Sequence, residues 1–253
     1  MRPHNEDHLG WGRIAVPAET AEAEPTGLIF VVADGLGAYG GGDVASEMAV
    51  TTLLRHAERA RDGRATQLLR SGFEAANLGI FDAALQGHGA GKMQTTMLAL
   101  ALSPGEAHMG HVGDCRAYRL RADSIELLST DHSQAMEMLR MRLITPEQAA
   151  DHPARHALTR SLGAELITRI DLRKDNLQAG DSFLLCSDGL WGKLTLAEIR
   201  DALAAPATET ALAHLVELAI ERGGEDNASG VMLRVLETPL APPRAPGWRR
   251  FFL

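Results

Sequence analysis

Four aspartates stand at the ends of apolar, strand-like runs. Asp34 ends the run in LIFVVADG, Asp114 follows MGHVG, Asp188 follows FLLCS, and Asp226 comes shortly before the run GVMLRV. A single Asp-Gly after such a run is typical of a tight turn, because both residues tolerate a positive φ. The pattern occurs repeatedly, and this indicates that the strand ends meet and form one carboxylate site.

The residue types at these positions point to a hard cation. No histidine or cysteine occupies a matching position, and oxygen-only sites suit Mg²⁺ or Mn²⁺ rather than zinc. Clustered carboxylates without a cation repel and raise one another's pKa values, and two cations remove that repulsion. Two ions about 3.5–4 Å apart can activate a water and clamp a phosphoryl group for in-line attack. A calcium EF-hand is excluded, because the spacing D-x-D-x-D-G is absent.

The elements that position these aspartates come as clustered strands and paired helices. Because a regular βαβ alternation is missing, the pattern favours an α+β fold with a mostly antiparallel sheet. Thr195 and Glu198 predict a capping box at the start of a further helix. Strand-like runs lie near residues 28–33, 95–102, 107–112, 116–120, 125–128, 182–186 and 229–236, and helical patterns cover residues 43–61, 65–86 and 208–222.

Composition narrows the class of protein. The chain has 253 residues, 45% of them hydrophobic and 23% charged, which suits a globular protein with a sizeable core. Its formal charge of −8 argues against a general nucleic-acid or membrane-surface binder. Cys115 and Cys186 have no metal-binding spacing, and the sequence contains no apolar run long enough to span a membrane and no signal peptide. These features predict a cytoplasmic protein.

Two segments differ from the rest of the chain. Residues 132–162 are polar, contain Pro146 and Pro153, and interrupt the strand pattern, so we expect a mobile flap that affects substrate choice. Residues 239–253 form a Pro-rich, basic-aromatic tail. This tail is expected to fray, or to contact a partner or an anionic membrane surface. Residues 1–238 would then form the catalytic domain.

Nine short motifs stand out along the chain: RPHNED (2–7), VVADGLG (31–37), GGDVAS (41–46), MQTT (93–96), HVGDCRAY (111–118), STDHS (129–133), ALTRSLG (157–163), LLCSDGLW (184–191) and EDNAS (225–229). Their order resembles that of the metal-dependent protein serine/threonine phosphatases of type 2C, and in particular the bacterial ones. The resemblance extends from residue 2 to about residue 235. It implies an α-β-β-α sandwich with the metals at one end of the central β-sandwich.

The resemblance also implies a role for each acidic residue at the metal site. Asp34 would bridge two Mn²⁺ or Mg²⁺ ions, and the carbonyl of Gly35 would bind the first ion. Asp188 and Asp226 would hold the second ion. Asp114 would share a third, weaker ion with Asp188.

The N-terminal motif would supply the remaining groups. Glu6 and Asp7 would orient waters around the ions, and Arg2 would hold the substrate phosphate with its guanidinium group. One departure concerns the proton donor to the leaving serine. Leu36 and Tyr39 stand where many relatives carry a histidine that is proposed as the general acid.

The activity implied by the resemblance is hydrolysis of phosphoserine and phosphothreonine in proteins by a metal-activated water, in opposition to a serine/threonine kinase. A phosphocysteine intermediate is not expected, because the sequence has no C-x5-R loop. One alternative is a non-catalytic module that binds phosphoproteins, against which stands the complete set of metal carboxylates. Another is a hydrolase of small phosphoesters, for which the sequence gives no sign of an aromatic base pocket.

Overall fold

The computed structural model describes residues 4–15, 26–37, 40–60 and 64–237. Arg2, Tyr39 and the tail at residues 239–253 lie outside these residues, so the predictions made for them stay predictions. None of the described helices has the length and apolar character needed to cross a membrane.

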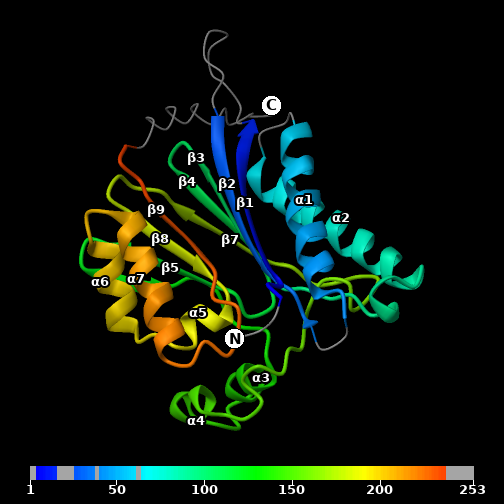
Figure 1. Cartoon of the computed structure of the whole chain (residues 1–253). Helices are drawn as coiled ribbons and strands as arrows, with labels where there is room; N and C mark the ends of the chain where they lie inside the picture. The colour runs from blue at the N-terminus through cyan, green and yellow to red at the C-terminus, as the bar shows by residue number, and fades with distance from the viewer. Residues whose placement is uncertain (1–3, 16–25, 38–39, 61–63, 238–253) are drawn as a thin grey trace, which may run out of the picture.

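Two antiparallel sheets face each other in the described part of the chain (Figure 1). The first sheet has the order β1-β2-β3-β4-β7, with strands Asp7–Ala15, Thr26–Asp34, Met97–Ser103, Glu106–Val112 and Asp171–Asn176. The second sheet has the order β6-β5-β8-β9, with strands Ser124–Leu127, Arg116–Arg121, Ser182–Cys186 and Gly230–Arg234.

A pair of helices covers the outer face of each sheet. Helices α1 (Gly42–Arg59) and α2 (Ala65–Leu85) pack on the first sheet, and α6 (Leu196–Ala204) and α7 (Thr208–Glu221) pack on the second (Figure 1). This arrangement confirms the predicted α-β-β-α sandwich. The shorter helices are η2 (His88–Gly91), α3 (Gln134–Arg140), α4 (Pro146–Ala150) and α5 (Asp188–Trp191).

Three apolar clusters separate the four layers. Neighbouring residues of one strand point into different clusters, as the two-residue period of a strand requires. Val31 packs under α1 and α2, whereas Val32 packs between the sheets. Phe183 likewise fills the space between the sheets, and Leu184 packs under α6 and α7. Burying a side chain of this size stabilises the fold by about 1.5–3 kcal/mol.

The predicted elements agree with the observed ones to within a few residues, and the predicted capping box is present. The Glu198 N–H donates to Thr195 Oγ1 at 3.3 Å, and the Thr195 N–H donates to Glu198 Oε2 at 2.8 Å. Two strands had no counterpart among the predicted elements, β1 and β7. Strand β7 reads DLRKDN and lies at a sheet edge, where charged side chains are tolerated and apolar alternation is not required.

Strand β1 escaped prediction because glycine is rare in strands and this one contains two. The glycines allow α1 to lie close to the sheet. A Cβ atom on Gly10 would lie 2.6 Å from Val50 and 2.8 Å from Leu54. Close packing against α1 therefore requires glycine, and glycine is also the reason that the sequence does not predict this strand.

The flap, residues 132–162, contains the short helices α3 and α4 and lies beyond one end of the sandwich (Figure 1). Its two ends are joined, because the Thr159 N–H donates to the carbonyl of His132 at 2.8 Å. The His132 N–H in turn donates to the carbonyl of Gly113 at 2.8 Å. The base of the flap is thus attached to the turn that carries Asp114.

Candidate metal centre

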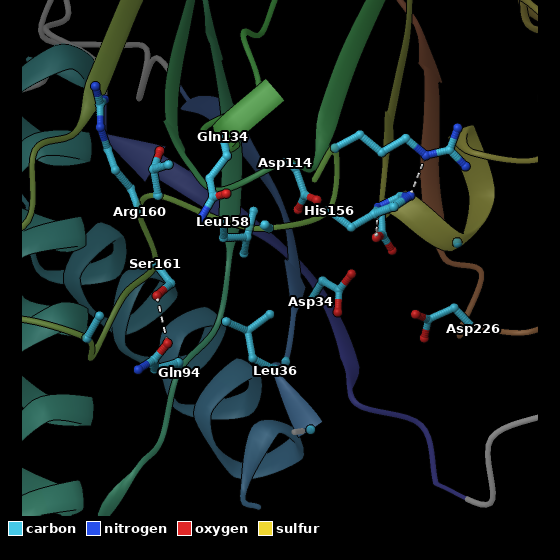
Figure 2. Close-up of a pocket in the computed structure, with 18 of the residues that line it drawn as sticks. Asp34, Leu36, Gln94, Asp114, Gln134, His156, Leu158, Arg160, Ser161 and Asp226 are labelled. Carbon is cyan, nitrogen blue, oxygen red and sulfur yellow. Dashed lines mark hydrogen bonds and ion pairs between the residues drawn. The ribbon is translucent and has the colours of Figure 1, made fainter. Parts of the chain in front are cut away.

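The predicted metal residues come from four separate elements and line one cavity. Asp34 ends β2 and is followed by Gly35, Asp114 lies in the turn between β4 and β5, Asp188 begins α5, and Asp226 precedes β9. The cavity has a volume of about 1050 Å³ and opens at the flap end of the sandwich. Figure 2 shows Asp34, Asp114 and Asp226 directed toward a common space.

The N-terminal acids lie beside this space. Asp7 is the first residue of β1 and is paired in register with Asp34, the last residue of β2. The carbonyl of Glu6 accepts a hydrogen bond from the Gly35 N–H at 3.0 Å, and the Glu6 N–H donates to Asn227 Oδ1 at 3.0 Å. These contacts link the first and last of the described motifs around the site.

The backbone of Asp34 is held by the two threonines of the MQTT motif. The Asp34 N–H donates to Thr96 Oγ1 at 3.0 Å, and its carbonyl accepts from the Thr96 N–H and the Thr95 hydroxyl, each at 2.8 Å. Thr96 Oγ1 also lies 3.1 Å from Cys115 Sγ. Gly113 has a φ of 110° and packs on Thr96. Thr96 therefore positions both Asp34 and the turn that carries Asp114.

Ser187, in the LLCSDGLW motif, positions groups around Asp188 as Thr96 does around Asp34 and Asp114. The buried Ser187 hydroxyl donates to Asp7 Oδ2 at 2.7 Å, and the Ser229 N–H donates to Ser187 Oγ at 3.1 Å. Ser187 thus connects Asp7 on the first sheet to β8 and β9 on the second. Its neighbour Asp188 is held at the junction of the two sheets.

The carboxylates lie close to one another, and Asp7, Asp34 and Asp114 are buried. Both conditions shift their pKa values. Burial, followed by the charges of Asp7, Asp188 and Asp114, raises the pKa of Asp34 well above its ordinary value. Burial and the charge of Asp188 raise the pKa of Asp114 in the same way. Burial raises the pKa of Asp7 to about 6, although hydrogen bonds from Ser187 and Ser229 oppose it. The raised pKa values show that, among the described residues, nearby positive charges do not offset burial and mutual repulsion at Asp34, Asp114 and Asp7.

The pKa of Asp188 shifts in the opposite direction, because a histidine contacts this carboxylate. Burial acts to raise its pKa, but the hydrogen bond with His156, together with the charge of that ring when it is protonated, leaves the pKa of Asp188 below its ordinary value. His156 Nδ1 lies 3.0 Å from Asp188 Oδ2 (Figure 2). His156 belongs to the flap, and no local pattern marks it, since it is far in sequence from Asp114 and Asp188. Only the tertiary fold brings it to the site.

Unpartnered oxygen atoms test whether the residues fit a metal ion. Among the described residues, the buried side-chain atoms without a hydrogen-bond partner are Asp7 Oδ1, Asp188 Oδ1 and both ring nitrogens of His111. An unpartnered buried carboxylate oxygen is destabilising unless a cation neutralises it. Two such oxygens among crowded aspartates fit Mn²⁺ or Mg²⁺, which prefer oxygen ligands.

Comparison with known proteins identifies the class to which this fold and this carboxylate site belong. The protein phosphatase 2C family matches residues 18–230. The "Serine/threonine phosphatase stp" of Listeria innocua is 33% identical over 243 residues, which cover 92% of this chain and 91% of that protein. The chain therefore belongs to the protein phosphatase 2C family.

Solved structures agree with this assignment. The serine/threonine phosphatase PstP/Ppp of Mycobacterium tuberculosis superposes with a TM-score of 0.82 at 27% identity, covering 94% of each chain. The catalytic domain of PstP in complex with two manganese ions superposes with a TM-score of 0.78 at 26% identity, again covering 94% of each chain. The protein is a metal-dependent serine/threonine phosphatase that acts on phosphoproteins and uses Mn²⁺ or Mg²⁺.

Proposed function

We propose that this phosphatase carries out its reaction at the cavity formed by Asp34, Asp114, Asp188 and Asp226. The observation that carries the proposal is the convergence of mutually repelling carboxylates, of which Asp34 and Asp114 are buried. Asp188 Oδ1 and the neighbouring Asp7 Oδ1 lack a hydrogen-bond partner. Asp34 would bridge two ions with help from the Gly35 carbonyl, and Asp188 and Asp226 would hold the second ion. When bound, the two ions supply water activation and neutralise charge around the phosphoryl group.

The chain's own residues prepare this site. Thr95 and Thr96 fix the backbone of Asp34, so the carboxylate does not have to reorganise when charge develops in the transition state. Asp7 and Glu6 lie beside it and would orient water, as outer groups do at other metal sites. Arg2 remains our proposed phosphate clamp, because its guanidinium group can form two parallel bonds to phosphate oxygens.

The shape of the cavity supports a protein substrate over a small phosphoester. Its lining continues from the carboxylates along the flap to Ile167 and Arg169. Ile167 is 82% exposed, and the Arg169 side chain is also exposed. An exposed apolar residue beside a basic one offers contacts to a chain that extends beyond the phosphorylated residue.

We further propose that the protein works in the cytoplasm, where it reverses a serine/threonine kinase. The sequence feature that supports this location is a pair of cysteines without a disulfide or zinc spacing. Both cysteines are buried and free.

The test is hydrolysis of matched phosphothreonine, phosphoserine and phosphotyrosine peptides and of a small aryl phosphate, each with Mn²⁺, Mg²⁺ or EDTA. We expect turnover of the first two peptides with either ion, little turnover of phosphotyrosine, and none in EDTA. Peptide binding without turnover at any ion concentration would support the non-catalytic module. A kcat/KM for the aryl phosphate far above that for every peptide would support the small-phosphoester alternative.

A further inference from the structure

The flap reaches into the metal centre through one side chain. His156 Nδ1 lies 3.0 Å from Asp188 Oδ2, and ligand atoms of Asp114, His156 and Asp188 all lie within 4.8 Å of one another. Asp188 Oδ1 is buried there without a hydrogen-bond partner. We propose that His156 supplies a nitrogen ligand to an ion held by Asp114 and Asp188, so that binding of this ion fastens the flap to the site. The inference rests on the metal roles proposed above for the two aspartates.

The imidazole is already held in place. Its ring stacks on Trp191 with a centroid distance of 6.1 Å and an interplanar angle of 21°. The Trp191 Nε1–H donates to the carbonyl of Asp114 at 3.0 Å, and the Arg116 guanidinium lies 3.4 Å from the indole centroid. Arg116 is fixed in turn by a two-pronged pair with Asp131. A ligand on such a platform loses little conformational freedom when it binds an ion.

The donor set predicts which ions this position prefers. Two carboxylates and one imidazole provide three protein ligands, which leaves coordination positions for water or for a phosphate oxygen of the substrate. Nitrogen ligands favour transition-metal ions over Mg²⁺, which prefers oxygen. The position with His156 should therefore favour Mn²⁺ over Mg²⁺ more strongly than the oxygen-only positions around Asp34 and Asp226.

Arg155 opposes the ion. Its Nε–H donates to His156 Nε2 at 2.9 Å, so Nε2 is an acceptor and Nδ1 carries the proton that points to Asp188. Coordination through Nδ1 requires the other neutral tautomer of the ring. The proton leaves Nδ1 and a proton binds to Nε2, so the net charge of the ring does not change. Arg155 must then give up its hydrogen bond. The ion and the Arg155 guanidinium therefore compete for the same ring.

The test is Mn²⁺ binding to the full chain, prepared without a histidine tag. Electron paramagnetic resonance counts the bound ions, and its pulsed form detects a ¹⁴N nucleus coordinated to Mn²⁺. We expect a nitrogen-coupled ion in the parent protein. In both His156→Ala and His156→Asn the coupling should disappear, and the affinity for that ion should fall by at least about tenfold. His214→Ala, which removes an exposed histidine on α7, should match the parent.

Two further comparisons complete the test. Arg155→Leu should raise the affinity for the nitrogen-coupled ion, because it removes the competing donor and a nearby positive charge. Hydrogen exchange in residues 132–162 should slow when Mn²⁺ is added to the parent, but much less in His156→Ala. Equal protection in both proteins would overturn the coupling between the ion and the flap.

The outcomes separate this inference from the proposed function. A parent protein that hydrolyses phosphothreonine but shows no nitrogen-coupled Mn²⁺ would overturn the role of His156 and leave the function standing. A parent protein that binds no Mn²⁺ and has no turnover would overturn both. Loss of turnover in His156→Ala with the nitrogen coupling intact would also contradict the inference, because the coupling would then come from another histidine.

Discussion

At the scale of single residues, Asp188 has the greatest number of roles in the proposed centre. It lies at the junction of β8 and α5, contacts His156, and is assigned to two ion positions. Its neighbour Ser187 connects the two sheets by contacts that do not use the Asp188 side chain. A change confined to the carboxylate should therefore affect the chemistry and leave the framework intact.

We predict that Asp188→Asn lowers kcat for a phosphothreonine peptide by at least about two orders of magnitude, while the melting temperature in EDTA stays close to that of the parent. An ion contributes several kcal/mol of charge stabilisation, and each tenfold loss of rate corresponds to about 1.4 kcal/mol. Steady-state kinetics at saturating Mn²⁺ measures the effect. Asp123→Asn, in the exposed β5–β6 turn, is the matched control. Near-parental turnover of Asp188→Asn would show that the ions lie elsewhere.

The sequence was sufficient to predict the aspartates that share the cavity, because each follows or precedes an apolar strand whose end can be recognised. The groups that hold them were harder to predict. Thr96 acts through its side chain on two distant turns, and His156 reaches the site from an irregular flap. Neither role depends on sequence spacing, so neither leaves a local pattern. The role of Arg2 stays a prediction.

At the scale of elements, the fit of β1 against α1 determines how the first sheet presents Asp7 opposite Asp34. The strand reads DHLGWGRIA, and its glycines face the helix at different clearances. A Cβ atom on Gly10 would lie 2.6 Å from Val50, whereas one on Gly12 would lie 3.4 Å from Leu54. The first distance forces a side chain or the helix to shift, and the second is close to an ordinary contact.

We predict that Gly10→Ala lowers the free energy of unfolding by about 1–3 kcal/mol, the usual effect of overpacking. The matched variant Gly12→Ala should change it by less than about 1 kcal/mol, because alanine also reduces the entropy of the unfolded chain. Urea unfolding of both variants in EDTA provides the measurement. Similar destabilisation by the two substitutions would mean that clearance from α1 does not explain the glycines.

The helices and most of the strands could be predicted because, unlike β1, they have a regular apolar pattern. Their apolar residues repeat with a period that burial imposes, as Val31 and Val32 illustrate by entering different cores. Strand β7 has no such repeat, because it is a charged edge strand whose Arg173 side chain pairs with Glu126 and Asp175. Strand β7 is recognised by its backbone pairing with β4, and its side chains show no strand-like pattern.

At the scale of the whole molecule, the carboxylate centre links stability to pH and to metal ions. In the unfolded chain, aspartates ionise near a pKa of about 4. In the folded metal-free protein, burial raises the pKa of Asp7 to about 6 and raises the pKa values of Asp34 and Asp114 well above their ordinary value. Because the folded state then binds more protons than the unfolded state, these groups make stability fall as pH rises.

Buried histidines act in the opposite direction at lower pH. Burial lowers the pKa of His111 to about 3 and also lowers the pKa values of His108 and His132. The folded state therefore binds fewer protons at these rings than the unfolded state, and their contribution to stability is lost as pH falls below about 6.5. Above that pH, only the carboxylates with raised pKa values should make the stability of the fold depend on pH.

We predict that the melting temperature of the parent in EDTA falls relative to that of Asp34→Asn as pH rises from about 5 to about 8, because the raised pKa of Asp34 makes its ionisation cost stability, whereas the histidines act equally in both proteins. Saturating Mn²⁺ should remove this fall and raise the melting temperature throughout, since an ion at about 100 times its Kd adds about 2.7 kcal/mol. Asp34→Asn is the matched variant. Without metal it should melt higher than the parent at the upper end of the range, and Mn²⁺ should stabilise it less. Parallel pH profiles for the two proteins in EDTA would show that ionisation of Asp34 does not destabilise the fold.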